Sequence, residues 1–109
     1  MKIGASSESD SNEHRVALVP ETVERLVKAG HKVLIEKGAG TIAGFPDISY
    51  SQAGAETVSA IEVAKSVDVF VHIQPPTTDE VKALKNGCLV VSMLNARNDA
   101  SAVSALASV

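Results

Sequence analysis

The chain has 109 residues and a mass of 11.3 kDa, a length typical of one domain with one hydrophobic core. Its composition, 45% hydrophobic and 21% charged, is that of a folded globular domain and excludes general disorder. The net charge of −3, the scarcity of aromatic residues and the lack of a basic run argue against a nucleic-acid partner. No apolar run approaches the roughly 20 residues that cross a bilayer, and the N-terminus lacks a signal-peptide core, so we expect a soluble segment.

The first third of the chain predicts a strand, a helix and a second strand. Residues 2–5 form a short apolar strand, which a long polar loop follows. Pro20 suits the first turn of a helix and Gly30 its C-terminal stop, so we expect a helix over residues 21–29. The run KVLIE, residues 32–36, has the β-branched density of a strand buried on both faces. This strand–helix–strand order favours a parallel sheet.

The middle of the chain predicts a short helical turn and an extended segment. Asp47 is expected to act as the N-cap of a turn that ends at Gly54. Thr57 and Val58 follow, and we expect them to be extended.

Two capping-box patterns predict two more helices. Ser59 and Glu62 stand three residues apart and open a helix that we expect to reach Ser66. Thr77 and Glu80 repeat the pattern further along the chain. The side chains expected to face the core from these helices are Ile61, Ala64, Val81 and Leu84.

Strands and a final helix complete the chain. VDVFVHI, residues 67–73, is the strongest strand pattern, and two prolines end it. Residues 86–87, Asn-Gly, end the following helix, and CLVVSML, residues 88–94, predicts another strand buried on both faces. The single Cys88 has no partner for a disulfide or a zinc site, so we expect a buried apolar role and no bound metal. Residues 99–109 predict a helix without a cap or a polar stop.

These elements together predict an α/β fold of the Rossmann or flavodoxin type. We expect an open parallel sheet with helices on both faces, in three layers joined by right-handed crossovers. Because the last helix has no stop, we expect residues 1–109 to be a truncated fold, one subdomain whose second half lies outside this chain. Sheet faces that such a half would cover should make the chain self-associate or be only marginally stable.

Three glycines after the second strand resemble a nucleotide-binding loop. Gly38, Gly40 and Gly44 give G-x-G-x-x-x-G, whereas a dinucleotide fingerprint needs G-x-G-x-x-G between a strand and a helix. The sequence FPDIS that follows does not begin with a long helix. We therefore favour a tight turn that needs positive φ over direct contact with a nucleotide.

Polar side chains stand where the predicted strands end. Arg15 follows the first strand, His72 and Gln74 end the strongest one, and Asn95 and Arg97 end the last. Because the carboxyl ends of parallel strands meet at one edge of a sheet, these residues outline a polar cleft. In that cleft Arg15 is a candidate clamp for an anion.

The same polar residues also have simpler structural interpretations. Arg15 can be a surface arginine that bonds nearby carbonyls or Glu13, and the other polar residues can merely satisfy loop carbonyls. His14, His31 and His72 have equal claims to be a general base, yet none has an evident partner. We expect all three histidines to be structural and expect no catalytic residue in this chain.

Three segments carry a resemblance to a known family. They are ESDSNEHRVALVPETVERLVKAGHKVLIEKGAG, AGFPDISYSQAGAETV and DVFVHIQPPTTDEVKALKNGCLVVSMLNARN, which together fall within residues 2–98. This series resembles the N-terminal domain shared by alanine dehydrogenase and the α subunit of proton-translocating NAD(P) transhydrogenase. The NE-x-RVAL-x-P segment and the glycine series are specific to that superfamily.

Two positions, those of Gln74 and Asn95, divide the two branches of the family. Alanine dehydrogenases resemble this chain at Arg15, which meets the substrate carboxylate there, but they carry lysine at the position of Gln74 and histidine at that of Asn95. A neutral amide cannot supply the titratable group that amination of a keto acid uses. SMLNARN instead looks like the transhydrogenase pattern, so the resemblance favours that branch.

The resemblance implies an oxidoreductase and translocase function for the complete protein. Hydride would pass from NAD(H) on the α subunit to NADP(H) on a β subunit, coupled to proton transport through a membrane domain. It implies a homodimer at the cytoplasmic face of the inner membrane or on the mitochondrial matrix side. The nucleotide-binding residues would lie outside this chain, which we expect to be inactive alone, with Arg15, Gln74 and Asn95 as cleft candidates. The alternatives are an alanine dehydrogenase-like enzyme and a non-catalytic assembly module.

Overall fold

A computed structural model describes residues 1–8, 13–74 and 76–92. The elements in this part of the chain are β1 (Lys2–Ala5), α1 (Pro20–Lys28), β2 (Lys32–Glu36), α2 (Asp47–Gln52), β3 (Glu56–Val58), α3 (Ala60–Ser66), β4 (Val69–His72), α4 (Thr78–Ala83) and β5 (Leu89–Ser92). The strands form one sheet in the order β3-β2-β1-β4-β5, and every neighbouring pair is parallel. The predicted open parallel α/β sheet is confirmed.

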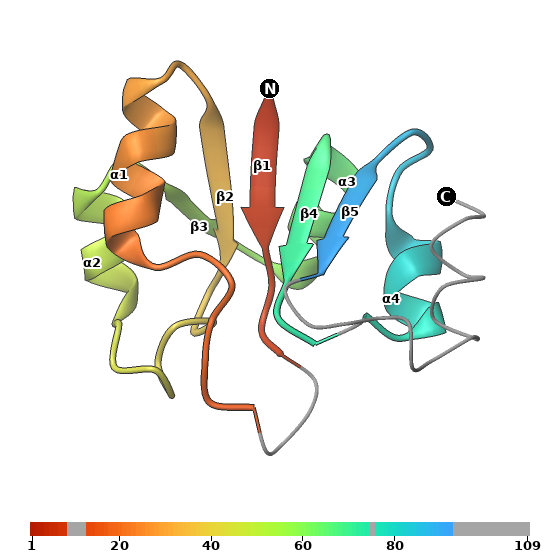
Figure 1. The fold of residues 1–109 in the computed structure, drawn as a ribbon, viewed down its shortest axis with the longest axis horizontal. Coiled ribbons are helices and arrows are strands. Elements are labelled where there is room, and N and C mark those ends of the chain that lie inside the picture. Colours follow the sequence, from red (N-terminus) through yellow and green to blue (C-terminus); the bar gives the residue numbers. More distant parts are fainter. Residues whose placement is uncertain (9–12, 75, 93–109) are drawn as a thin grey trace.

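The helices cover both faces of this sheet, which gives the expected three layers (Figure 1). Side chains along β2 alternate between two clusters: Val33 and Ile35 enter the first, and Leu34 enters the second. The helices contribute Val23 and Tyr50 to the first cluster and Val63 and Leu84 to the second. Thus α1 and α2 cover one face, and α3 and α4 cover the other.

The strand order reverses at the centre of the sheet, which is where open α/β sheets place ligand sites. β1 pairs with β2 on one side and with β4 on the other, so the strand order reverses at β1. In Figure 1 the arrowheads of β1 and β4 lie side by side at the lower edge of the sheet. Open α/β sheets bind ligands in the crevice at such a reversal, outside the carboxyl ends of the strands.

Two helix starts differ from the prediction. Asp47 is the first residue of α2 instead of its N-cap, a position that Pro46 takes. The Asp47 carboxylate accepts the backbone N–H of Gly38 at 2.8 Å, so it caps the glycine turn and not its own helix. At α3 the Ser59 hydroxyl accepts the N–H of Glu62 at 3.2 Å, but the complete reciprocal box forms only at α4.

Two expectations about burial were wrong. Ile61 does not face the core, since 64% of it is exposed, and Val63 provides the buried side chain of α3 instead. β5 is not buried on both faces, because Leu89 is 60% and Val91 is 40% exposed. It is an edge strand that pairs only with β4 among the described strands. Cys88 is buried as expected, but it lies directly before β5 and not inside the strand. The helix predicted for residues 99–109 lies outside the described residues.

Candidate functional site

The loop that follows β1 places an ion pair at the carboxyl edge of the sheet. The Glu13 carboxylate accepts hydrogen bonds from Arg15 Nε at 2.8 Å, from Nη2 at 2.9 Å and from the backbone N–H at 3.0 Å. Glu13 is buried, whereas the Arg15 side chain is 62% exposed. The planar guanidinium of Arg15 thus donates two hydrogen bonds to the Glu13 carboxylate, and another edge of the guanidinium faces solvent.

Gln74, just beyond β4, joins the same carboxylate. Its side-chain Nε2 donates to Glu13 Oε1 at 2.8 Å, the oxygen that Arg15 Nη2 also contacts. Two of the predicted cleft residues, Arg15 and Gln74, therefore meet through Glu13. Asn95 and Arg97 lie outside the described residues.

The electrostatics of this group follow from its geometry. The side-chain hydrogen bond from Arg15, followed by its backbone N–H and the Gln74 amide, outweighs desolvation and lowers the pKa of Glu13 to about 2. The hydrogen bond with Glu13 in turn raises the pKa of Arg15. Glu13 is thus an ionised carboxylate at neutral pH and stands where Arg15 and Gln74 could receive an external anion.

A hollow of about 400 Å³ lies beside this network, on the face of the sheet that α1 covers. Arg15 and the exposed His14 border it together with Val19, Phe45 and Ile73. The hollow gives Arg15 a mostly apolar neighbourhood that an organic anion would fill.

A second network of charges, which the sequence did not indicate, lies behind Gln74. His72 is completely buried, with its Nδ1 2.8 Å from the Gln74 carbonyl oxygen and 3.1 Å from Glu8 Oε1. Glu8 accepts the backbone N–H groups of Ile73 and Gln74, both at 2.9 Å. His72 Nε2 is 3.2 Å from Glu80 Oε2, within ion-pair distance but not aligned as a hydrogen bond.

The two glutamates keep His72 charged. Burial disfavours the cation, but the contacts with Glu8 and Glu80 and the Gln74 carbonyl outweigh it and raise the pKa of His72 to about 10. Burial would likewise raise the pKa of Glu80, yet the interaction with His72 and the backbone N–H of Thr77 lower it to about 2. His72 is already protonated at neutral pH, so it cannot be a general base there. Its structural role was expected, and the structure shows what that role is: it fixes the backbone of Gln74.

The other two histidines differ in position. His14 borders the hollow beside Arg15 and remains a candidate for proton transfer. His31 directly precedes β2, at the amino edge of the sheet and therefore far from the network. The signal for the His72 site in the sequence was weak, because Glu80 was interpreted only as a capping residue and Glu8 only as part of a polar loop.

The glycine turn after β2 is shaped by contacts within the chain. Gly38 and Gly44 have positive φ values of 81° and 93°, which confirms the tight-turn interpretation for these two positions. The N–H of Gly38 is held by the Asp47 carboxylate, whose charge would repel a pyrophosphate. Gly40 is needed for a different reason: a Cβ there would lie 2.6 Å from the ring of Tyr50. These contacts support a structural role for the turn.

Together, the sheet order and the polar groups at its carboxyl edge define a doubly wound α/β ligand-binding domain. Within the described residues, none of the helices has the length and apolar character that crossing a bilayer requires.

Comparison with known proteins narrows this class to a family. The model of the alanine dehydrogenase/PNT N-terminal domain matches residues 4–109, and the chain belongs to this family. Alanine dehydrogenase 2 of Staphylococcus aureus (strain USA300) is 37% identical over 106 residues, which cover 97% of this chain and 28% of that protein.

Solved structures from both branches of the family are similar to this chain. A transhydrogenase from Sinorhizobium meliloti superposes with a TM-score of 0.88 and 34% identity, covering 98% of this chain and 32% of that one. An L-alanine dehydrogenase superposes with a TM-score of 0.87 and 35% identity, and the match covers 100% of this chain and 30% of that one. The chain thus spans less than a third of each of these relatives, which are oxidoreductases.

Proposed function

We propose that the chain forms the N-terminal part of the NAD(H)-binding α subunit of a proton-translocating NAD(P) transhydrogenase. In this proposal it provides one wall of the cleft in which hydride leaves or reaches NAD(H). Residues outside residues 1–109 hold that cofactor, since the glycine turn of this chain has a structural role. NADP(H) is bound by the β subunit, and the complete protein is a homodimer that sits beside a membrane domain.

The observation that carries the proposal is the hydrogen bond from the Gln74 amide to Glu13. Gln74 is neutral, Glu13 stays ionised down to about pH 2, and the pKa of Arg15 is raised further by Glu13. None of these three groups can exchange a proton with a substrate near neutral pH. Transfer of hydride between two nicotinamides requires positioning and no proton exchange with the protein. A cleft wall made of Arg15, Glu13 and Gln74 is compatible with this reaction.

The second candidate is an alanine dehydrogenase-like enzyme. It is favoured by the identity of 37% to alanine dehydrogenase 2 and by the exposed edge of Arg15, which can pair with a substrate carboxylate. In that case the acid–base group must come from elsewhere, and the exposed His14 beside the hollow is the available group in the described part of the chain. A non-catalytic assembly role is the third possibility.

Two assays of the full-length protein that contains this segment separate the candidates. The first follows hydride transfer from NADPH to an NAD analogue in the presence of the β subunit. The second follows NADH oxidation with pyruvate and ammonia in its absence. We expect activity in the first assay alone. Activity in the second assay without a β subunit contradicts the proposal, and failure of both supports the assembly role.

A control variant tests whether His14 transfers a proton in the reaction. His14→Ala should leave hydride transfer unchanged, because the proposal gives His14 no proton to move. An alanine dehydrogenase that uses His14 as its base would lose about 100-fold or more in kcat.

A further inference from the structure

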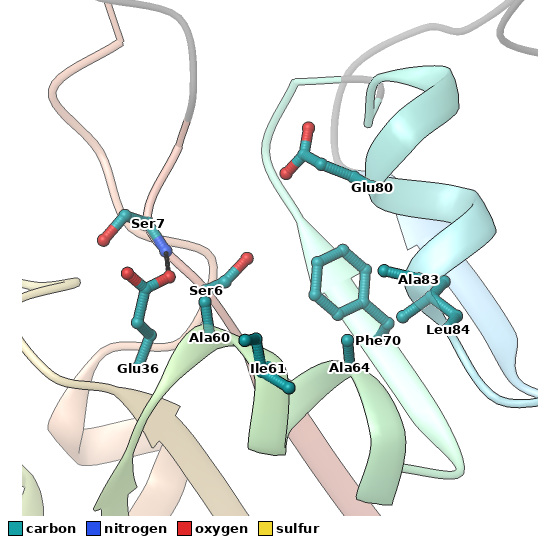
Figure 2. A pocket seen from close by; sticks show the side chains of 10 residues that line it. All are labelled: Ser6, Ser7, Glu36, Ala60, Ile61, Ala64, Phe70, Glu80, Ala83 and Leu84. Atoms are coloured by element: carbon teal, nitrogen blue, oxygen red, sulfur yellow. Dashed lines mark hydrogen bonds between the residues drawn. The ribbon is translucent and has the colours of Figure 1, made fainter.

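A second pocket lies on the opposite face of the sheet from Arg15, between α3 and α4 (Figure 2). Its volume is about 200 Å³. Figure 2 shows apolar side chains from both helices and from β4 around this pocket. These are Ala60, Ile61, Ala64, Phe70, Ala83 and Leu84.

The polar residues that line this pocket are Ser6, Ser7, Glu36 and Glu80. Glu36, the last residue of β2, accepts the backbone N–H of Ser7 at 2.9 Å, as Figure 2 shows. Glu80 borders the mouth from the α4 side, and its charge is offset by His72. Glu36 has no such offset, since no ion pair reaches it from the described Lys, Arg and His residues. One uncompensated carboxylate therefore faces an apolar pocket.

The size of the pocket limits the ligand. A dry engineered cavity of about 150 Å³ accepts benzene, so about 200 Å³ accepts one aromatic ring or a branched alkyl group with a short polar arm. Ile61 at the mouth is 64% exposed and offers an apolar surface that a ligand would cover. A complete dinucleotide or a drug-sized molecule would not fit, because pockets for such ligands are larger.

The charge at the mouth selects among ligands of this size. The Glu36 carboxylate repels an anionic group, and a neutral ligand would leave Glu36 without a counter-charge. A cationic arm would meet the Glu36 carboxylate while the apolar body fills the pocket.

We propose that this pocket is a binding site for a small primary amine whose body is an aromatic ring or a branched alkyl group, with its ammonium group paired to Glu36. The site uses the face of the sheet covered by α3 and α4, and none of its residues belongs to the Arg15–Glu13–Gln74 network. The inference goes beyond the proposed hydride-transfer function, and the pocket shares one residue, Glu80, with the His72 network behind Gln74.

The test compares three ligands with one ring and different charge: benzylammonium, benzyl alcohol and benzoate. Each is titrated into the ¹⁵N-labelled chain while backbone amide shifts are followed by NMR. A ligand of about eight non-hydrogen atoms is expected to bind with a Kd in the millimolar range. We expect benzylammonium to bind about tenfold more tightly than benzyl alcohol, with shifts at Ser7, Ala64 and Ala83, and benzoate to be weakest.

Two variants assign the effect to the pocket. Glu36→Gln keeps an oxygen for the Ser7 N–H, so the fold should persist, but the preference for benzylammonium over benzyl alcohol should fall to about twofold or less. Ala83→Leu on the exposed side of α4 should fill the pocket and weaken all three ligands. The matched control is Glu56→Gln, which removes a carboxylate that pairs with Lys32 and should change no affinity.

The result that would overturn the proposal is equal binding of benzylammonium and benzyl alcohol, or no shift at the pocket residues at about 10 mM of any ligand. A preference for benzylammonium that survives in Glu36→Gln would also overturn it, because the cation would then bind elsewhere. Unchanged amide spectra of the free variants show that each comparison is made on the folded chain.

Discussion

The side chain of Gln74 donates to the carboxylate of Glu13 at 2.8 Å, although 61 residues separate them in the sequence. The contact exists because β1 and β4 are neighbours, so that the loop after one strand meets the end of the other. Arg15 holds the same carboxylate, and Glu13 therefore occupies the place that an anionic ligand of Arg15 would take. The Arg15 Nε and Nη2 donors are thus occupied by a carboxylate of the chain itself, whereas another edge of the guanidinium stays exposed.

Replacement of Glu13 should open this site. In Glu13→Gln the charge that neutralises Arg15 is lost, so Arg15 can pair with an external carboxylate. We expect the affinity for pyruvate to rise about tenfold, measured through the NMR signal of Arg15 Nε–H. The free energy of unfolding should fall, because Arg15 and Gln74 lose an ionised acceptor.

A surface pair provides the control for that variant. Glu21→Gln removes the exposed partner of Arg25 on α1 and should change the free energy of unfolding by about 0.5 kcal/mol or less. Should Glu13→Gln bind pyruvate no better than the unmodified chain, Glu13 does not compete for Arg15.

The buried charge on His72 predicts a dependence of stability on alkaline pH. The pKa of His72 is about 10 in the folded chain, against an ordinary value of 6.5. Because the folded state holds this proton more tightly, the stabilisation is complete below about pH 6.5 and is lost as pH rises toward 10. The described groups that face His72 and set this pKa are Glu8 and Glu80.

The measurement compares urea unfolding of the unmodified chain and of His72→Gln. At about pH 6 the variant should be less stable by about 3 kcal/mol, since the buried Glu8 carboxylate and the partly buried Glu80 carboxylate lose their cation. At about pH 10 the difference should be much smaller. A difference that is the same at both pH values would show that His72 is neutral in the folded chain.

Two glycines in the same turn should respond differently to alanine. At Gly40 a Cβ would lie 2.6 Å from Tyr50 and 2.8 Å from the carbonyl oxygen of Phe45, so Gly40→Ala should cost about 3 kcal/mol. At Gly38 the space is open and only the positive φ opposes a side chain, so Gly38→Ala should cost about 1 kcal/mol. Denaturant midpoints measure both, and the reverse order would contradict the packing of Tyr50 described here.

Tyr50 can be followed by absorbance because it is the only tyrosine of the chain. Burial, with a smaller effect of the Asp47 charge, raises its pKa to about 12, so its ionisation should occur well above the ordinary value of 10.0. Its hydroxyl donates to the Leu18 carbonyl at 2.8 Å, and Tyr50→Phe should cost about 1 kcal/mol. A titration midpoint near 10 would mean that the ring is open to solvent.

Strands and helix starts were predicted well where neighbouring residues in the sequence determine them. The bounds of β1 and β2 agree with the sequence prediction, and in β2 the dense run of apolar and β-branched residues marks a strand with a buried centre. The complete capping box at Thr77 depends on two residues three apart, which a sequence shows directly. The exposure of Ile61 was missed because a helix as short as α3 leaves its inward face ambiguous from spacing alone.

The site was predicted only in part, because its contacts connect distant segments. Parallel strand order placed Arg15 and Gln74 at one edge, but nothing local indicated that Glu13 would join them. Glu8 lies 65 residues from Ile73, whose N–H it accepts, and a carboxylate in a polar loop ordinarily predicts solvent exposure. Such buried ionic contacts become visible only when the fold brings the loops together.

The central claim is that this chain forms one wall of a cleft and leaves the dinucleotide to residues outside it. Titration of NADH into the 109-residue chain by calorimetry tests this most directly. We expect no saturable heat at ligand concentrations of about 1 mM. Saturable binding at micromolar NADH would contradict it, because the glycine turn or the Arg15 hollow would then hold the dinucleotide without a second half.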